Sequence, residues 1–157
     1  MELLAKHPQD LAVVLKHMPL KSHRKAMGAA IAAQAAHRQG KFWEMHALLF
    51  QNRRALDRPD LEKYAGELAL DLDKFKADLD DPKTKQEVLA DQAIALKVGA
   101  RSTPSSYVNG MGVRGAKPLD HFAKVLAAEL VVANRLIDQG TPLAEVYEKA
   151  SKLKLKS

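Results

Sequence analysis

Histidines are the side chains of this sequence best suited to metal binding or acid–base chemistry, and six are present. His17, His23, His37 and His46 fall in different predicted elements. No pair has the His-x-x-x-His or His-Glu-x-x-His spacing that places two ligands on one helix face. Because a metal site needs three or four convergent ligands, we expect these histidines to serve in packing or hydrogen bonding and expect no metal.

Three serines near Pro104 are the candidate hydroxyl nucleophiles: Ser102, Ser105 and Ser106. The Gly-x-Ser-x-Gly motif, which places such a serine on a sharp strand-to-helix turn, is absent from the sequence. The glycines at 110, 112 and 115 have the spacing of a hairpin and a strand exit, not of a strand–turn–helix. We therefore predict neither serine catalysis nor dinucleotide binding, and assign no catalytic residue.

Cysteine is absent from all 157 residues. Without a thiol the chain forms no disulfide, offers no thiolate nucleophile and builds no cysteine-ligated zinc site. Thiol–disulfide exchange requires a thiolate, so the sequence predicts that this chain alone does not catalyse it.

The Asn109-Gly110 dipeptide is the strongest local structural signal in the chain. Both residues accept a positive φ at low cost, so they predict a two-residue turn between Ser105–Val108 and Met111–Arg114. Pro104 immediately precedes the first arm, where a residue without an N–H is tolerated. The sequence thus predicts a β-hairpin whose first strand is entered through a proline.

Upstream of the hairpin, the apolar run Leu11–Leu15 predicts a strand buried on both faces, with a buried helix turn as the alternative. A short helix is expected before Pro8. Five further helices are predicted between this run and the hairpin, over residues 22–38, 42–50, 60–70, 71–79 and 82–98. Their expected N-caps include Ser22, Asp60, Asp71 and Asp81. Two more helices are predicted after the hairpin, over 118–137 and 141–152.

Apolar helix faces are expected to supply the core. The candidates in the 42–50 helix are Trp43, Met45, Leu48, Leu49 and Phe50. The candidates in the 118–137 helix are Leu119, Phe122, Val125, Leu126, Leu130 and Ala133. The candidates in the last helix are Leu143, Val146, Tyr147 and Ala150.

Several of these motifs together resemble a known family. They are Gly99-Ala100-Arg101-Ser102-Thr103-Pro104, Val108-Asn109-Gly110, Gly115-Ala116, Pro19-Leu20-x-x-His23 and Gln39-Gly40-Lys41-Phe42-Trp43-Glu44-Met45-His46. Over roughly residues 10–130 this combination is similar to the DsbA-like disulfide oxidoreductases, which have a thioredoxin fold. The resemblance implies an α/β fold with a small mixed sheet and a large inserted helical subdomain, lacking the N-terminal βαβ portion with its Cys-x-x-Cys.

The resemblance also implies a domain plan and a site. Residues 1–157 would form one truncated thioredoxin-like domain, with a helical insertion over 22–98, a hairpin and covering helix over 101–137, and a helix and basic tail over 141–157. In the family the Thr-Pro bond is cis and its backbone pairs with an extended peptide. That implies a cis-Pro loop and peptide groove made by Arg101, Ser102, Thr103 and Pro104, with no cofactor and no metal.

Three functional hypotheses follow. The first is a cysteine-free family member, catalytically inactive as given, that serves as a peptide-binding or interaction module around Pro104. The second is the C-terminal part of a working thiol–disulfide oxidoreductase whose Cys-x-x-Cys lies in an absent N-terminal segment. The third and weaker one is an enzyme of glutathione-transferase or isomerase type on the same fold. The DsbA-like family is often exported or periplasmic, but localisation stays unknown.

Composition limits the partners. The net charge of +6 is a mild excess, gathered in part at the C-terminal end, and aromatic residues make up 5% of the chain, so no nucleic-acid platform is predicted. No signal peptide and no apolar run long enough to span a bilayer is recognised, and no membrane partner is expected. The resemblance also implies that a central strand of the family sheet, between Leu11–Leu15 and Ser105–Val108, is missing from this sequence. Its absence would leave the edges of these two strands open. They would pair with each other, recruit a second copy as a homodimer, or indicate a fragment.

Overall fold

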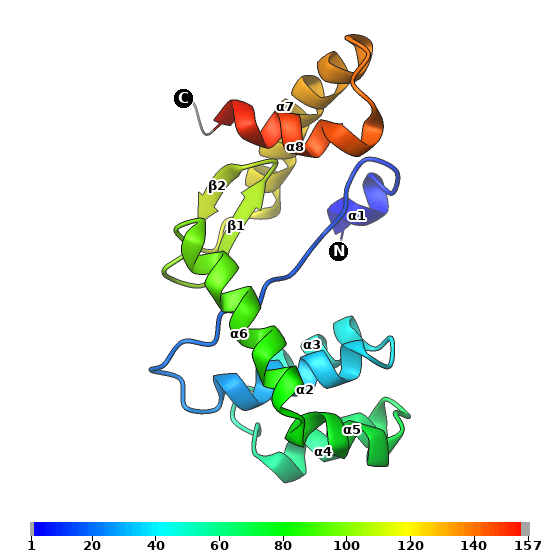
Figure 1. The fold of residues 1–157 in the computed structure, drawn as a ribbon, viewed down its shortest axis with the longest axis vertical. Coiled ribbons are helices and arrows are strands. Elements are labelled where there is room, and N and C mark those ends of the chain that lie inside the picture. Colours follow the sequence, from blue (N-terminus) through cyan, green and yellow to red (C-terminus); the bar gives the residue numbers. More distant parts are fainter. Residues whose placement is uncertain (1, 155–157) are drawn as a thin grey trace. The chain divides into compact units, whose positions relative to one another are not determined.

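The computed structural model describes residues 2–154, and Figure 1 shows their elements. The helices are α1 (Glu2–Lys6), α2 (Ala26–His37), α3 (Phe42–Gln51), α4 (Arg58–Glu67), α5 (Leu72–Asp80), α6 (Pro82–Lys97), α7 (Leu119–Asp138) and α8 (Leu143–Lys154). The strands are β1 (Ser105–Val108) and β2 (Met111–Arg114). Two compact units divide the chain: Leu15–Gly99, here the helical unit, and Met1–Val14 with Ala100–Ser157, here the hairpin unit.

Helix α2 is the centre of the helical unit and contacts α3, α4, α5 and α6 (Figure 1). Alanine fills its inner faces, and small side chains let the neighbouring helices approach closely. Larger side chains from the surrounding helices complete the core, and Met45 and Phe75 are fully buried. The buried cluster comprises Ala32, Ala33, Ala35, Ala36, Met45, Leu49, Leu61, Tyr64, Ala65, Leu70 and Phe75.

Aspartates begin three of these helices. Asp71 accepts a hydrogen bond from the backbone N–H of Lys74, and Asp81 accepts one from that of Lys83, as the sequence predicts. Helix α4 differs from the prediction, because Asp57 is its N-cap and Asp60 is the reciprocal partner in a capping box.

The predicted cap at Ser22 is also wrong. Helix α2 begins at Ala26, four residues later, and Lys25 precedes it without a side-chain cap. Residues 21–25 form turns instead, in which His23 N–H donates to the Leu20 carbonyl and Ala26 N–H donates to the His23 carbonyl. These local bonds satisfy the backbone before the helix begins.

The hairpin unit contains the predicted hairpin. β1 and β2 pair antiparallel with Val108 opposite Met111 and Ser105 opposite Arg114, so both predicted arms are confirmed. The turn residues Asn109 and Gly110 have φ values of 45° and 89°. The buried apolar side chains of the described part of this unit are Ala100, Val113, Leu126, Val146 and Ala150.

The predicted strand Leu11–Leu15 is wrong, and so is the helical alternative. These residues lie in neither a helix nor a strand, and the sheet of the described residues consists of β1 and β2 alone. Val13 and Val14 are 47% and 75% exposed. A strand is held by hydrogen bonds to a neighbouring strand, so an apolar run without one does not form it.

Part of the predicted core is exposed. Met45, Leu49, Leu126, Val146 and Ala150 are buried as predicted. Of the other candidates, five are exposed in the structure: Trp43, Phe50, Leu119, Leu143 and Tyr147. Helical spacing placed these residues on an apolar face, but it did not show which part of each face another element covers.

Candidate functional site

The loop before β1 holds the four residues predicted as a peptide groove. Arg101, Ser102, Thr103 and Pro104 are all exposed, and the Thr103–Pro104 peptide bond is cis, as predicted. The Ser105 hydroxyl donates to the Ser102 carbonyl at 2.6 Å. Gly115 N–H donates to the Pro104 carbonyl at 2.9 Å. The loop is therefore tied to the hairpin on one side while its side chains face solvent.

Strand β1 continues directly from this loop and has β2 as its partner in the sheet of the described residues. A strand paired on one side presents backbone N–H and C=O groups on the other. An extended peptide uses such an edge by adding a further strand, with main-chain hydrogen bonds providing affinity. The loop and β1 together form one continuous stretch, residues 101–108, that is suited to this kind of recognition.

A second cluster, in the helical unit, brings together histidines that the sequence placed apart. The ring centroid of Phe42 lies 5.8 Å from that of His17, 5.9 Å from that of His37 and 6.0 Å from that of His46. His23 instead lies exposed before α2. Three of the four histidines therefore pack around one phenylalanine, a convergence that their spacing in the sequence did not predict.

Burial disfavours the charged form of two histidines in this cluster, His17 and His46. Burial lowers the pKa of His17, and the nearby Asp91 carboxylate opposes this shift only in part. Asp91 accepts from the backbone N–H of His17 at 3.2 Å and from Lys16 Nζ at 2.7 Å. The Nε2 atom of His17 is buried without a hydrogen-bond partner in the described structure. Burial also lowers the pKa of His46.

This arrangement is unlike a catalytic or metal centre. No carboxylate orients His17 Nε2, which an acid–base histidine normally requires. Among residues 2–154, no group of three or more histidine, aspartate or glutamate side chains is placed to hold a metal ion. The cluster therefore packs α3 against the segment that precedes α2. Its rings extend from the buried His17 to the exposed side of α3.

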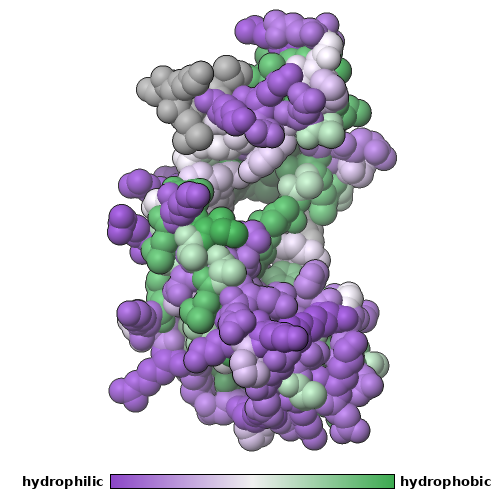
Figure 2. Space-filling model, in the orientation of Figure 1, coloured by the Kyte–Doolittle hydropathy of each residue, from purple (hydrophilic) through white to green (hydrophobic). Residues whose placement is uncertain are grey.

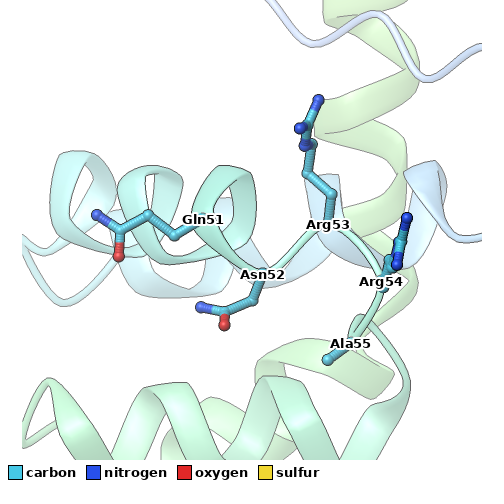
Figure 3. A pocket seen from close by; sticks show the side chains of 5 residues that line it. All are labelled: Gln51, Asn52, Arg53, Arg54 and Ala55. Carbon is cyan, nitrogen blue, oxygen red and sulfur yellow. The ribbon is translucent and has the colours of Figure 1, made fainter.

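A hollow of about 380 Å³ lies where α3 ends, lined by Gln51, Asn52, Arg53, Arg54 and Ala55. Figure 3 shows the guanidinium groups of Arg53 and Arg54 on the same side of the loop, with the amide of Asn52 turned to the other side. Asn52 Nδ2 donates to the Leu48 carbonyl at 2.9 Å and so closes the end of the helix. Both arginines are exposed.

These α3 features carried no functional prediction. The positions of Trp43, His46 and Phe50 at i, i+3 and i+7, followed by the Arg53-Arg54 pair, were the available signal. Helical spacing alone predicted Trp43 and Phe50 as core, because sequence does not separate a buried face from an exposed one. None of the helices in the described part of the chain is long and apolar enough to cross a bilayer.

Comparison with known proteins adds the following. The profile of the family described as DSBA-like thioredoxin domain matches residues 1–127. The Na(+)/H(+) antiporter NhaA of Herminiimonas arsenicoxydans is 37% identical over 145 residues, which are 92% of this chain and 22% of that protein. The Na(+)/H(+) antiporter NhaA 3 of Salinispora tropica is 42% identical over 128 residues, which are 81% of this chain and 20% of that protein. The chain thus spans about a fifth of the length of these relatives, and no solved structure gives a significant match.

Proposed function

The chain belongs to the family of DSBA-like thioredoxin domains, and we propose that it acts as a polypeptide-holding module without redox chemistry of its own. Family membership agrees with the predicted thioredoxin-like fold class. The chain contains no cysteine, and disulfide exchange needs a thiolate. In this proposal the loop before β1 and strand β1 contact the polypeptide.

The observation that carries this proposal is the continuous stretch from Arg101 to Val108. Its first four residues are exposed, and β1 presents one edge that β2 does not occupy. An extended polypeptide would pair its backbone with β1, while the Arg101 guanidinium attracts acidic side chains next to the pairing segment. Recognition through the backbone gives little selectivity for the sequence of the bound segment.

Titration with S-carboxymethylated insulin B chain tests this site, because that probe is extended, carries negative charge and has no free thiol. Amide chemical-shift changes are expected at residues 101–108. Arg101→Glu should weaken binding about tenfold through charge repulsion, whereas the matched Arg135→Glu on α7 should leave it unchanged. Shifts confined to other residues, or equal effects of the two variants, would contradict the proposed site.

An insulin-reduction assay tests the proposed absence of redox activity. Turbidity from insulin reduction by dithiothreitol should proceed at the same rate with and without the chain. A rate increase that survives removal of trace oxidoreductases would refute the proposed inertness.

A second candidate is the C-terminal part of a thiol–disulfide oxidoreductase whose Cys-x-x-Cys lies in a segment outside this sequence. The observation that favours it is the apolar run Leu11–Leu15, which lies outside the sheet with Val13 and Val14 exposed. Strands of such a segment would pair with this run and with β1. The reading frame upstream of Met1 decides this candidate, since an in-frame Cys-x-x-Cys supports it and a stop codon without one excludes it.

The similar proteins suggest that this chain is part of a longer protein. Two of them are named Na(+)/H(+) antiporters and are about five times as long as the matched segment. We propose that this chain corresponds to a domain carried by such a transporter. Continuity of its reading frame with transporter helices is the expected finding, and an isolated gene would contradict it.

A second copy of the chain is the alternative occupant of the β1 edge. Two copies would pair as a C2 dimer through an intermolecular sheet. Light scattering at micromolar concentration should then give twice the 17.3 kDa mass of one chain. A monomer at that concentration would exclude this mode.

A further inference from the structure

Helix α3 carries a line of aromatic rings that the polypeptide site does not use. The Trp43 and His46 ring centroids lie 5.6 Å apart, and those of His46 and Phe50 lie 4.7 Å apart. Trp43 is 38% exposed and Phe50 is 64% exposed. Trp43, His46 and Phe50, here the α3 aromatic stripe, therefore form a continuous and partly exposed apolar surface along one side of the helix. Because burial lowers the pKa of His46, its ring stays uncharged near neutral pH.

The stripe ends at two cations without acidic partners. No ion pair joins Arg53 or Arg54 to a carboxylate within residues 2–154, and both side chains border the hollow of about 380 Å³ (Figure 3). Two other arginines of the helical unit are held by carboxylates: Arg38 contacts Asp78 and Glu87, and Arg58 contacts Asp80. Arg24 has no ion pair to a described carboxylate either, but it lies before α2, away from the stripe in the sequence. The charge of Arg53 and Arg54 is thus available to an external anion.

We infer that the α3 aromatic stripe, with Arg53 and Arg54, is a docking surface for an anionic phospholipid bilayer. Tryptophan and phenylalanine rings partition into the interface between headgroups and acyl chains. Arginine pairs with phosphate through several N–H donors, and each basic residue near an anionic surface adds attraction. The ten-residue helix would lie in the plane of the interface without crossing it.

Two features favour a bilayer over an acidic polypeptide. The exposed rings form a convex helix face, whereas a partner helix is normally received in a groove. The two guanidinium groups point to the same side of the loop, as contact with one charged plane requires (Figure 3). This contact qualifies the sequence expectation of no membrane partner, which rested on the lack of a spanning segment.

Trp43 is the single tryptophan of the chain, so its fluorescence reports directly on this surface. Vesicles of phosphatidylglycerol and phosphatidylcholine in equal parts should shift its emission to shorter wavelength, and pure phosphatidylcholine vesicles should not. The shift should weaken as salt is raised, because salt screens the arginine–lipid attraction. A shift caused by inorganic phosphate alone, or by polyglutamate in place of vesicles, would overturn the bilayer assignment in favour of a simple anion or an acidic polypeptide.

Paired variants test which charges matter. Arg53→Gln with Arg54→Gln should weaken vesicle binding about thirtyfold, from about 1 kcal/mol for each basic residue. Lys83→Gln with Lys85→Gln removes equal charge from exposed positions of α6 and should weaken it far less. Unchanged circular dichroism of both variants establishes that they are folded. Equal losses would show that net charge, not this surface, drives binding, and would refute the inference.

Insulin B chain binding at 101–108 is measured separately, so either proposal can fail without the other.

Discussion

The helical unit and the hairpin unit differ in the size of their buried apolar cores. The helical unit contains the fully buried Met45, Phe75 and Val88, together with alanines that let helices pack closely. In the hairpin unit, Val131, Leu143 and Tyr147 are 62%, 76% and 68% exposed. Figure 2 shows mostly hydrophilic residues over α2–α5 of the helical unit and a mixture of hydrophilic and hydrophobic residues over the hairpin unit.

This contrast indicates that the two units have different requirements for stability. A unit with a filled core is stabilised by its own contacts, whereas a two-stranded sheet is marginal without further strands or covering helices. The hairpin unit also holds the proposed polypeptide site, and its open β1 edge is the feature that makes both instability and binding expected there. We therefore expect the helical unit to act as the stable part of the molecule and the hairpin unit to gain order on binding.

The largest effect is expected from the core of the helical unit. Phe75→Ala removes the largest fully buried side chain and should lower the free energy of unfolding by about 3–5 kcal/mol. Leu143→Ala in the hairpin unit, where the side chain is 76% exposed, should change it by less than about 0.5 kcal/mol. Urea denaturation followed by the amide NMR signals of each unit measures both. Similar losses would show that Leu143 is covered in solution and would contradict the proposed difference between the two units.

A second variant concerns the ion pairs that join helices in the helical unit. The Arg38 side chain is 23% exposed and contacts Asp78 at 2.6 Å, and the Asp78 side chain is 14% exposed. Arg38→Met should therefore lower the free energy of unfolding by about 2 kcal/mol, because it leaves a mostly buried carboxylate unpaired. Arg58→Met removes a more exposed pair and should have a much smaller effect, measured by the same urea titration.

Glycine substitutions should affect the backbones of the two units in opposite directions. At Gly110 φ is +89°, and an added Cβ would lie 3.2 Å from the Cα and carbonyl oxygen of Ser151. Gly110→Ala should lower the free energy of unfolding of the hairpin unit by about 1 kcal/mol. Gly28 lies in α2 with open space around its Cα, so Gly28→Ala should stabilise the helical unit by about 0.5–1 kcal/mol. Thermal melts read by amide signals of each unit distinguish the two effects.

The remaining effect is a dependence of stability on pH. Burial lowers the pKa of His17 and of His46, so the unfolded chain binds more protons than the folded one as the pH falls through 6.5. Stability of the helical unit should therefore decrease below pH 6.5, by at most about 1.4 kcal/mol per pH unit for each histidine. A plot of the free energy of unfolding against pH should have a shallower slope below pH 6.5 in His17→Gln. A slope unchanged by this variant would exclude His17 as its source.

Local sequence signals predicted the fold well where the chemistry is local. The Asn109-Gly110 turn with its two arms, and the caps at Asp71 and Asp81, depend on residues within a few positions of each other. The boundary of α4 was missed because Asp57 and Asp60 both suit an N-cap, and the capping box decides between them through its reciprocal bonds.

Features that depend on distant partners were not predicted. The run Leu11–Leu15 has the composition of a strand, but composition does not supply the neighbouring strand that it needs. The convergence of His17, His37 and His46 on Phe42 arises from packing between α2, α3 and the segment before them. For the same reason Trp43 and Phe50 were assigned to the core, although their side of α3 is exposed.

Native-state hydrogen exchange on the full chain follows both units in one sample and so measures the difference in their stability. Amides of α2–α6 should exchange only through global unfolding of the helical unit, and those of β1, β2 and α8 should exchange orders of magnitude faster. Bound polypeptide should slow exchange in β1. Equal protection of the amides of both units in the free chain would contradict the claim that the hairpin unit is the less stable one and gains order on binding.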